Sequence, residues 1–155
     1  MSQNLFHRSL RAACAVVLLT AGPVAAATVY GADLAVTVAD PAPVHGGGFT
    51  FLHPVVRNTG GIATTEPFTL AVHLPPGVVG TGTAPGGTCS TGPHGHTVTC
   101  TFPAGLDAGA TAGAEVRISV ASGMAPEVLR GTVEVALPGD PTPADNSATF
   151  DIEVL

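Results

Sequence analysis

Two histidines separated by a single glycine, His94 and His96, have the best spacing in this sequence for binding a transition metal. Side chains two positions apart on a strand face the same side, and neutral imidazole is a ligand for zinc, copper and nickel. His45, His53 or His73 would have to complete the ligand set. The other interpretation, a polar hairpin tip, needs no further ligand. We favour it and expect no cofactor.

Oxygen ligands for calcium are offered by Asp140, Asp145 and Asn146 in a proline-rich stretch. Hard cations take carboxylate and amide oxygens, but calcium loops usually hold more carboxylates at alternating positions. Asp and Asn also form turns, because their side chains bond to the nearby backbone. We favour a turn over an ion.

Groups for hydrolytic catalysis are not evident. The sequence has no G-x-S-x-G motif, and its serines fall in expected turns or strands without a recognisable base. These serines are Ser90, Ser119, Ser122 and Ser147. Glu115, Arg117 and Glu134 alternate with apolar residues and are expected on solvent-facing sides of strands. We therefore predict a protein that is not an enzyme.

A platform of exposed aromatic rings for sugar binding is also poorly represented. There is no Trp, and the one Tyr is Tyr30, in the lead-in to the first expected strand. Three phenylalanines fall on expected core faces: Phe68, Phe102 and Phe150. Phe49 and Phe51 are the remaining candidates for such a platform, and by sequence they can equally belong to the core.

Cys89 and Cys100 are predicted to form a disulfide between neighbouring antiparallel strands. Turn residues lie between them, around Pro93, and a turn there sets the two cysteines opposite each other. Cys100 alternates in step with Val98 and Phe102, so we expect the bridge to lie largely on the buried side. Closing so short a loop should stabilise the fold by ~3 kcal/mol.

Residues 1–27 have the order of features of a secretory signal peptide. Arg8 and Arg11 precede an apolar run over residues 12–20, a Gly-Pro pair ends the run, and small residues follow. A membrane anchor is the alternative, but the run is shorter than the ~20 residues that a spanning helix needs. We expect cleavage before Thr28 and a secreted, extracellular protein without a membrane span. Its retention at the cell envelope is left open.

The expected mature chain, residues 28–155, has the length of one domain and a strongly acidic composition. All eleven acids lie in it beside three arginines and no lysine, which gives a net charge of −8. Binding to phosphate backbones depends on clustered Lys and Arg. We therefore expect no nucleic-acid partner. The even pair of cysteines agrees with an oxidising compartment.

Apolar and polar residues alternate in the segments between glycine- and proline-rich turns. Successive side chains of a strand face opposite sides, so each segment offers one apolar face. The segments span about residues 34–38, 68–74, 97–102, 115–120, 133–137 and 149–154, with a seventh around Phe49–Arg57. Pro54 interrupts the seventh and predicts an edge strand or a bulge. The pattern predicts an all-β, immunoglobulin-like antiparallel β-sandwich of about seven strands.

The order of several short motifs resembles a bacterial family. The motifs are Asn58-Thr59-Gly60, Leu74-Pro75-Pro76-Gly77-Val78, Gly87-Thr88-Cys89, Val98-Thr99-Cys100, Leu106-Asp107-Ala108-Gly109-Ala110 and the stretch over residues 140–149. In this order they resemble the conserved-repeat module called domain of unknown function eleven, and secondarily the cell-adhesion-related domain of bacteria. The resemblance implies an immunoglobulin-like sandwich of secreted and cell-surface proteins, without catalytic residues.

The function that we expect is a secreted or cell-surface, non-enzymatic structural or protein-interaction module of adhesion type. A protein or cell-envelope component would bind through an edge strand, because unpaired backbone groups there can accept another strand. The alternative is an extracellular metal-binding protein that uses His94 and His96.

Overall fold

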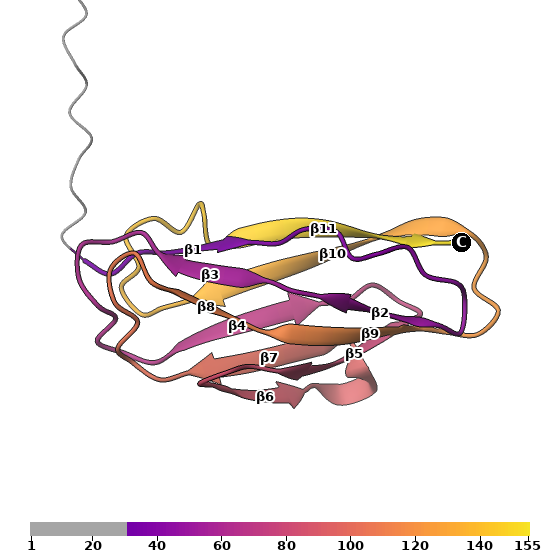
Figure 1. The fold of residues 1–155 in the computed structure, drawn as a ribbon, viewed down its shortest axis with the longest axis horizontal. Coiled ribbons are helices and arrows are strands. Elements are labelled where there is room, and N and C mark those ends of the chain that lie inside the picture. The colour runs from indigo at the N-terminus through magenta and orange to yellow at the C-terminus, as the bar shows by residue number, and fades with distance from the viewer. Residues whose placement is uncertain (1–30) are drawn as a thin grey trace, which may run out of the picture.

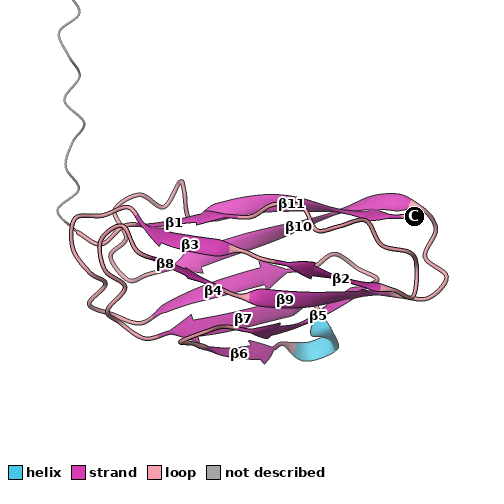
Figure 2. Cartoon of the chain, viewed as in Figure 1, coloured by secondary structure: helices cyan, strands magenta, loops and turns pink. Residues whose placement is uncertain are grey.

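The structure is a computed structural model that describes residues 31–155. The signal peptide expected over residues 1–27 lies outside the described residues and stays a prediction. The described residues contain eleven strands and one short 3₁₀ turn, η1 (Pro93–Gly95), drawn in cyan in Figure 2. No helix among them is long and apolar enough to cross a membrane.

The strands alternate with turns along the whole described chain. They are β1 (Leu34–Thr37), β2 (Phe49–Leu52), β3 (Val55–Asn58), β4 (Phe68–His73), β5 (Val78–Thr83), β6 (Thr88–Thr91), β7 (Thr97–Phe102), β8 (Thr111–Gly113), β9 (Glu115–Val120), β10 (Glu127–Ala136) and β11 (Ser147–Val154).

Two antiparallel layers face each other across one core (Figure 1). One layer is a five-stranded sheet in the order β11-β10-β4-β7-β6. The other consists of the ladders β1-β3-β8 and β2-β9-β5, which continue into each other because β2 leads into β3 and β8 into β9. The predicted all-β, immunoglobulin-like antiparallel sandwich is confirmed.

Pro54 lies between β2 and β3. β2 is the outer strand of the ladder β2-β9-β5, so the predicted edge strand is confirmed for β2, and no bulge forms. The register pairs on its two sides are Leu52–Val116 and Val55–Gly113. The register therefore continues across Pro54 with no extra residue, and Pro54 faces Ala114. The Ala114 N–H donates to the Pro54 carbonyl at 3.3 Å, whereas proline has no N–H to return the bond. One missing bond interrupts both strands without shifting either.

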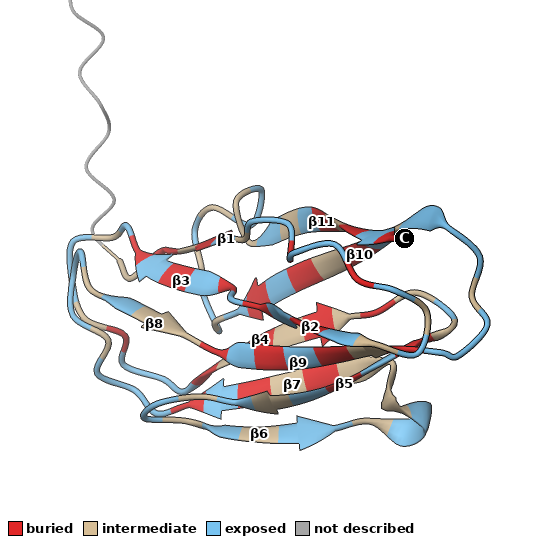
Figure 3. Cartoon of the chain, turned by 45° about the vertical axis from the view of Figure 1, so that its right-hand side comes forward, coloured by how far each residue is buried: buried red, intermediate tan, exposed pale blue. Residues whose placement is uncertain are grey.

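Inward-facing side chains fill the core where the alternation predicts them. Phe68 and Phe102 face each other on β4 and β7, and their rings stack with centroids 5.0 Å apart. Phe150 of β11 is 1% exposed and covers Gly131 of β10, where a Cβ would lie 2.3 Å from the ring. Figure 3 shows the resulting bands of buried and exposed residues along β9 and β10. The predicted core positions of these three phenylalanines are confirmed.

Strand β5 was not expected from the sequence, because only its first inward position is a large apolar residue, Val78, and the next two are Gly80 and Gly82. A Cβ on Gly80 would lie 2.7 Å from Leu74 Cδ1, and a Cβ on Gly82 would lie 2.7 Å from Val98 Cγ1. Side chains from neighbouring segments therefore fill the space that inward side chains of β5 would need. The hydrophobic alternation of a strand is absent here although the strand is present.

Candidate functional site

The predicted disulfide joins Cys89 of β6 to Cys100 of β7. The two residues face each other in the ladder, with Cα atoms 4.0 Å apart. Cys100 is 1% exposed, whereas Cys89 is half-buried. The turn between the strands is η1, which begins at Pro93. The pairing and the hairpin are confirmed. The bridge was expected largely on the buried side, and it is fully buried at Cys100 and partly buried at Cys89.

The turn η1 gives His94 and His96 different surroundings. His94 lies inside the turn with a φ of 64°, in the left-handed region, and its side chain is exposed. His96 follows the turn, and its Nδ1 lies 2.8 Å from the Val78 carbonyl oxygen. Because a carbonyl only accepts hydrogen bonds, this contact requires the proton on Nδ1. The spacing argument had assumed that both histidines lie on one strand. The structure shows that they do not.

The three histidines considered as further metal ligands contact other groups. His45 Nδ1 lies 3.3 Å from the Leu155 carbonyl, His53 Nε2 lies 3.4 Å from Glu115, and His73 Nε2 lies 3.8 Å from Glu134. Within residues 31–155, the only group of three potential ligand side chains close enough to share an ion contains no histidine. Metal binding by His94 and His96 stays a hypothesis.

An exposed aromatic face lies on the outer side of β2, β9 and β5. Phe49 is 53% exposed and Phe51 is 40% exposed, and their rings meet edge to face with centroids 5.8 Å apart. Arg117 faces Phe51 in the ladder and places its Cζ 4.2 Å from the centre of the Phe49 ring. Val79, on the other side of β9, is 44% exposed. We call Phe49, Phe51, Val79 and Arg117 the aromatic face.

Arg117 gives the aromatic face its charge. Its guanidinium donates to Ser119 Oγ at 3.1 Å and lies over the face of the Phe49 ring. A cation in this position is attracted by the negative face of the ring. In the described part of the chain, Arg117 forms no ion pair with a carboxylate. The face therefore combines exposed apolar surface with a positive charge that forms no ion pair within the described residues.

A second cluster contains Asp33, just before β1, and Asp140 and Asp145 from the loop between β10 and β11. One carboxylate oxygen from each lies within 4.8 Å of the others. The Thr142 N–H donates to Asp140 Oδ1 at 3.0 Å, so the predicted turn role of Asp140 is confirmed. Burial, the Asp33 charge and, to a smaller extent, the Asp140 charge raise the pKa of Asp145 above its ordinary value. We call these three residues the acidic cluster.

Sequence reasoning identified Asp140 and Asp145 but not Asp33. Asp33 comes from the other end of the described chain, and no spacing rule connects it to the late loop. Only the fold joins them: the Leu34 N–H donates to Asp140 Oδ2 at 2.9 Å, and the Val36 N–H donates to the Asp145 carbonyl at 3.0 Å.

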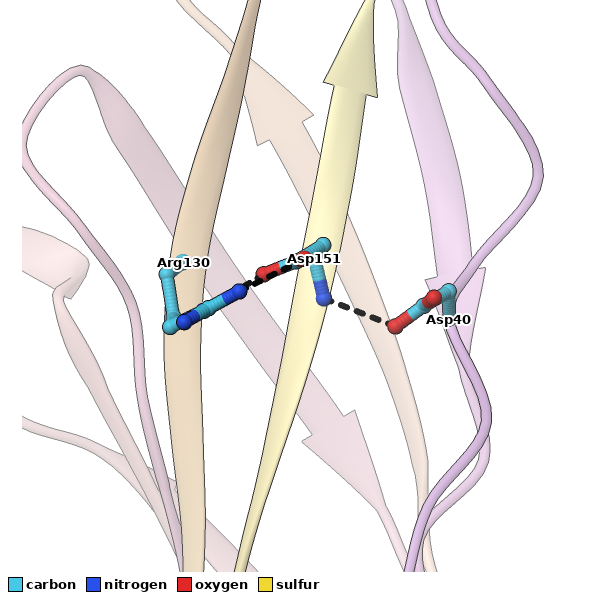
Figure 4. Close-up of polar contacts among 3 residues, drawn as sticks. All are labelled: Asp40, Arg130 and Asp151. Atoms are coloured by element: carbon cyan, nitrogen blue, oxygen red, sulfur yellow. Dashed lines mark hydrogen bonds and ion pairs between the residues drawn. The ribbon is translucent and has the colours of Figure 1, made fainter.

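The outer edge of β11 is covered by the segment that follows β1. Val44 forms a parallel bridge with Val154, and its N–H donates to the Glu153 carbonyl at 2.9 Å. The Asp151 N–H, which also points outward, donates to Asp40 Oδ1 at 2.7 Å (Figure 4). These contacts use backbone groups that an added strand would need. At the opposite edge of this sheet, the short strand β6 carries no buried residue.

Comparison with solved structures places this chain among immunoglobulin-like β-sandwich domains. The third cohesin of ScaC from Acetivibrio cellulolyticus, solved in complex with the ScaB dockerin, matches with a TM-score of 0.59 and 13% identity, over 79% of this chain and 99% of that one. The major pilin subunit BcpA of Bacillus cereus matches with a TM-score of 0.54 and 9% identity, over 79% of this chain and 40% of that one.

The CARDB domain of PF1109 from Pyrococcus furiosus, solved in complex with di-metal ions, matches with a TM-score of 0.50 and 17% identity, over 88% of this chain and 99% of that one. A weaker match, with a TM-score of 0.48, is AvmM, which catalyzes a macrocyclization. Identities this low show the fold alone.

No protein-family model matches the sequence. No curated protein matches it either. The comparisons therefore support the fold that the resemblance implies, an immunoglobulin-like sandwich that a CARDB domain shares, and not a particular family.

Proposed function

We propose that this protein is a secreted or cell-surface, non-enzymatic module that binds a protein partner through the aromatic face. The observation that carries the proposal is the exposure of Phe49 and Phe51 beside Arg117 on one face of the sheet. Single exposed apolar residues are ordinary, but contiguous exposed aromatic surface is typical of interaction sites. Aromatic residues and arginine also contribute most of the binding energy at many interfaces.

The chemistry of the aromatic face defines the segment that it fits. A partner would place an apolar side chain against the rings of Phe49 and Phe51 and a carboxylate beside the Arg117 guanidinium. Such a carboxylate would pair with a cation that has no acidic partner within the described residues. This charge complementarity is limited to the aromatic face. The expected mature chain carries a net charge of −8, so the rest of its surface repels an acidic partner.

Two further observations support a protein partner. The segment around Val44 already occupies the edge of β11. The aromatic face is therefore more accessible to a partner than that edge. Two of the similar structures belong to protein assemblies, a cohesin bound to a dockerin and a major pilin subunit. Binding through the exposed edge of β6 is the second route and follows the original edge-strand hypothesis.

The test combines capture with quantitative binding. The purified chain is used to capture proteins from the envelope of its own cells, and each captured protein is then purified and titrated against wild type, F49A/F51A and R117Q. We expect F49A/F51A to weaken binding at least about thirtyfold, the scale of an interface hot spot. V128A is the matched control, because Val128 is 63% exposed on β10, in the other sheet.

Equal binding by wild type and F49A/F51A, with both proteins folded, would contradict the proposal. Loss of binding to a cell-envelope polysaccharide in F49A/F51A, with no protein titrating, would assign the aromatic face to sugar instead. Thermal unfolding of each variant checks that the sandwich is intact.

A further inference from the structure

The acidic cluster concentrates negative charge where water has limited access. Asp33 is 5% exposed, and Asp140 and Asp145 are half-buried. Their three carboxylate oxygens lie within 4.8 Å of one another. Within residues 31–155, no arginine or histidine forms an ion pair with any of them. Burying carboxylates this close together without a cation is energetically costly.

Several oxygens at this place lack any hydrogen-bond donor. Asp33 Oδ2 accepts from the Thr59 hydroxyl at 3.0 Å, but Asp33 Oδ1 is buried and unpartnered. Asp145 Oδ1 and Asn146 Oδ1 are also buried without a partner. Buried polar atoms are nearly always satisfied in native proteins, so three unsatisfied acceptors in and beside one carboxylate cluster indicate a missing positive group.

Backbone hydrogen bonds position Asp140 and Asp33 in the cluster. Asp140 receives the Leu34 N–H on Oδ2 and the Thr142 N–H on Oδ1, at 2.9 and 3.0 Å. The Asp33 N–H donates to Asn58 Oδ1 at 3.2 Å. These bonds place carboxylates from both ends of the described chain in fixed positions. The site is therefore preformed by β1 and the loop between β10 and β11.

We infer that the acidic cluster binds one calcium ion, with Asp33, Asp140 and Asp145 as ligands and Asn146 Oδ1 as a further oxygen donor. Calcium takes carboxylate and amide oxygens at 2.3–2.6 Å, so two ligands of one ion lie at most about 5.2 Å apart. The 4.8 Å limit of the cluster satisfies this condition. Magnesium is a poorer fit, because it requires near-ideal octahedral geometry at shorter distances.

Solvent reaches the cluster from the loop side. Asp140 and Asn146 line a surface depression together with Gly139 and Pro143. The depression gives solvent access to Asp140 and Asn146, whereas Asp33 and Asp145 do not line it. Bound calcium would join β1 to the loop before β11, and these segments come from opposite ends of the described chain.

Calcium binding is tested on the purified chain after removal of metals with a chelator, with CaCl₂ alone as the probe. We expect isothermal titration calorimetry to give one ion per chain, with a Kd of about 10⁻⁴–10⁻³ M or tighter, the range of extracellular calcium modules. Calcium should also raise the unfolding temperature, because it binds the folded state. MgCl₂ should bind at least about tenfold more weakly.

The variant D145N provides a two-sided readout. In chelator it should unfold at a higher temperature than wild type, because it removes one of three repelling charges. In calcium it should bind at least about tenfold more weakly and lose most of the thermal shift. The matched control is D107N, since Asp107 is an exposed acid in another loop, and it should behave as wild type. If D145N does not fold, D140N serves in its place.

Two outcomes would overturn the inference. One is a folded wild-type chain that shows neither binding nor a thermal shift in millimolar calcium. The other is a calcium shift that D145N and D140N retain in full, which would place the ion elsewhere. A chain that is stabilised by D145N and insensitive to calcium would show that the cluster shares a proton instead. Because no readout depends on the aromatic face, failure here leaves the proposed protein-binding role untouched.

Discussion

Arg130 and Asp151 form the best-defined ion pair of the described residues (Figure 4). The Arg130 guanidinium donates Nε and one terminal nitrogen to the two Asp151 oxygens, at 2.8 and 3.0 Å. The hydrogen bond from Arg130 is the main cause that lowers the pKa of Asp151 below its ordinary value. The pair thus joins β10 to β11 on the solvent side, while Asp40 holds the backbone of the same residue.

This shift predicts how stability depends on pH. Because the pKa of Asp151 is lower in the folded than in the unfolded chain, the pair stabilises the fold above the unfolded pKa of about 4. The contribution is lost as pH falls through the lowered folded value. In R130Q we expect a small loss of stability at neutral pH that disappears in acid, measured by urea unfolding at several pH values. R57Q, which removes an exposed arginine of β3, should show no such pH-dependent difference; an equal effect in both variants would contradict the assignment.

At the scale of the strand, the local rule for Pro54 predicted the edge position of β2, whereas the bulge that it also allowed is absent. Proline usually marks an edge strand or a bulge, because it lacks a donor for the ladder. Here the neighbouring register pairs continue on both sides, and the Pro54 carbonyl still accepts from Ala114. The pairs of β2 with β9 and of β3 with β8 keep the register on both sides, so one bond is lost without a shift. The sequence predicts the interruption, whereas the strands that pair with β2 and β3 come from distant parts of the chain.

The hairpin of β6 and β7 carries the disulfide, and we expect its stability to depend on this bond. β6 has four residues, none of them buried, and pairs with β7 alone, so it has little packing of its own. We expect C89A/C100A to lower the free energy of unfolding by about 2–4 kcal/mol, because the bridge restricts the unfolded chain. Chemical denaturation measures the loss, and reduction of the wild-type protein should cause a similar one. Unchanged stability in both experiments would show that the bridge adds nothing to the fold.

At the scale of the whole molecule, the two sheets use most of their apolar surface on each other. The inner residues of both layers form one buried cluster that includes Phe68, Ile118, Val133 and Ile152. What remains for contact with other molecules lies on outer faces and in the loops at the ends of the sandwich. The aromatic face and the acidic cluster are of these two kinds, and they are carried by different strands.

Export is a prediction for the whole chain. If residues 1–27 are a signal peptide, the protein in the culture supernatant or envelope fraction should begin near Thr28, and intact mass spectrometry will detect this. Cys14 would leave with the signal, so the mature protein should also contain no free thiol. A secreted form that retains Met1, or a free thiol in the native protein, would contradict this processing.

The sequence alone determined the features that depend on neighbours in the chain. Alternation predicted most strands, and turn residues between Cys89 and Cys100 predicted their pairing, because strand periodicity and hairpin turns are local properties. The sequence could not predict the side on which Phe49 and Phe51 lie. Phe49 and Phe51 alternate with Thr50 and Leu52, so apolar residues occupy both faces and the pattern does not choose between them.

Tertiary structure decided which side of β2 is buried, and it also brought the acidic cluster together. Packing against the five-stranded sheet buried Thr50 and Leu52 and left both rings in solvent. The meeting of Asp33 with Asp140 and Asp145 depends on how β1 lies against the loop before β11. No local rule connects residues more than a hundred positions apart, because chain folding rather than sequence spacing brings them together.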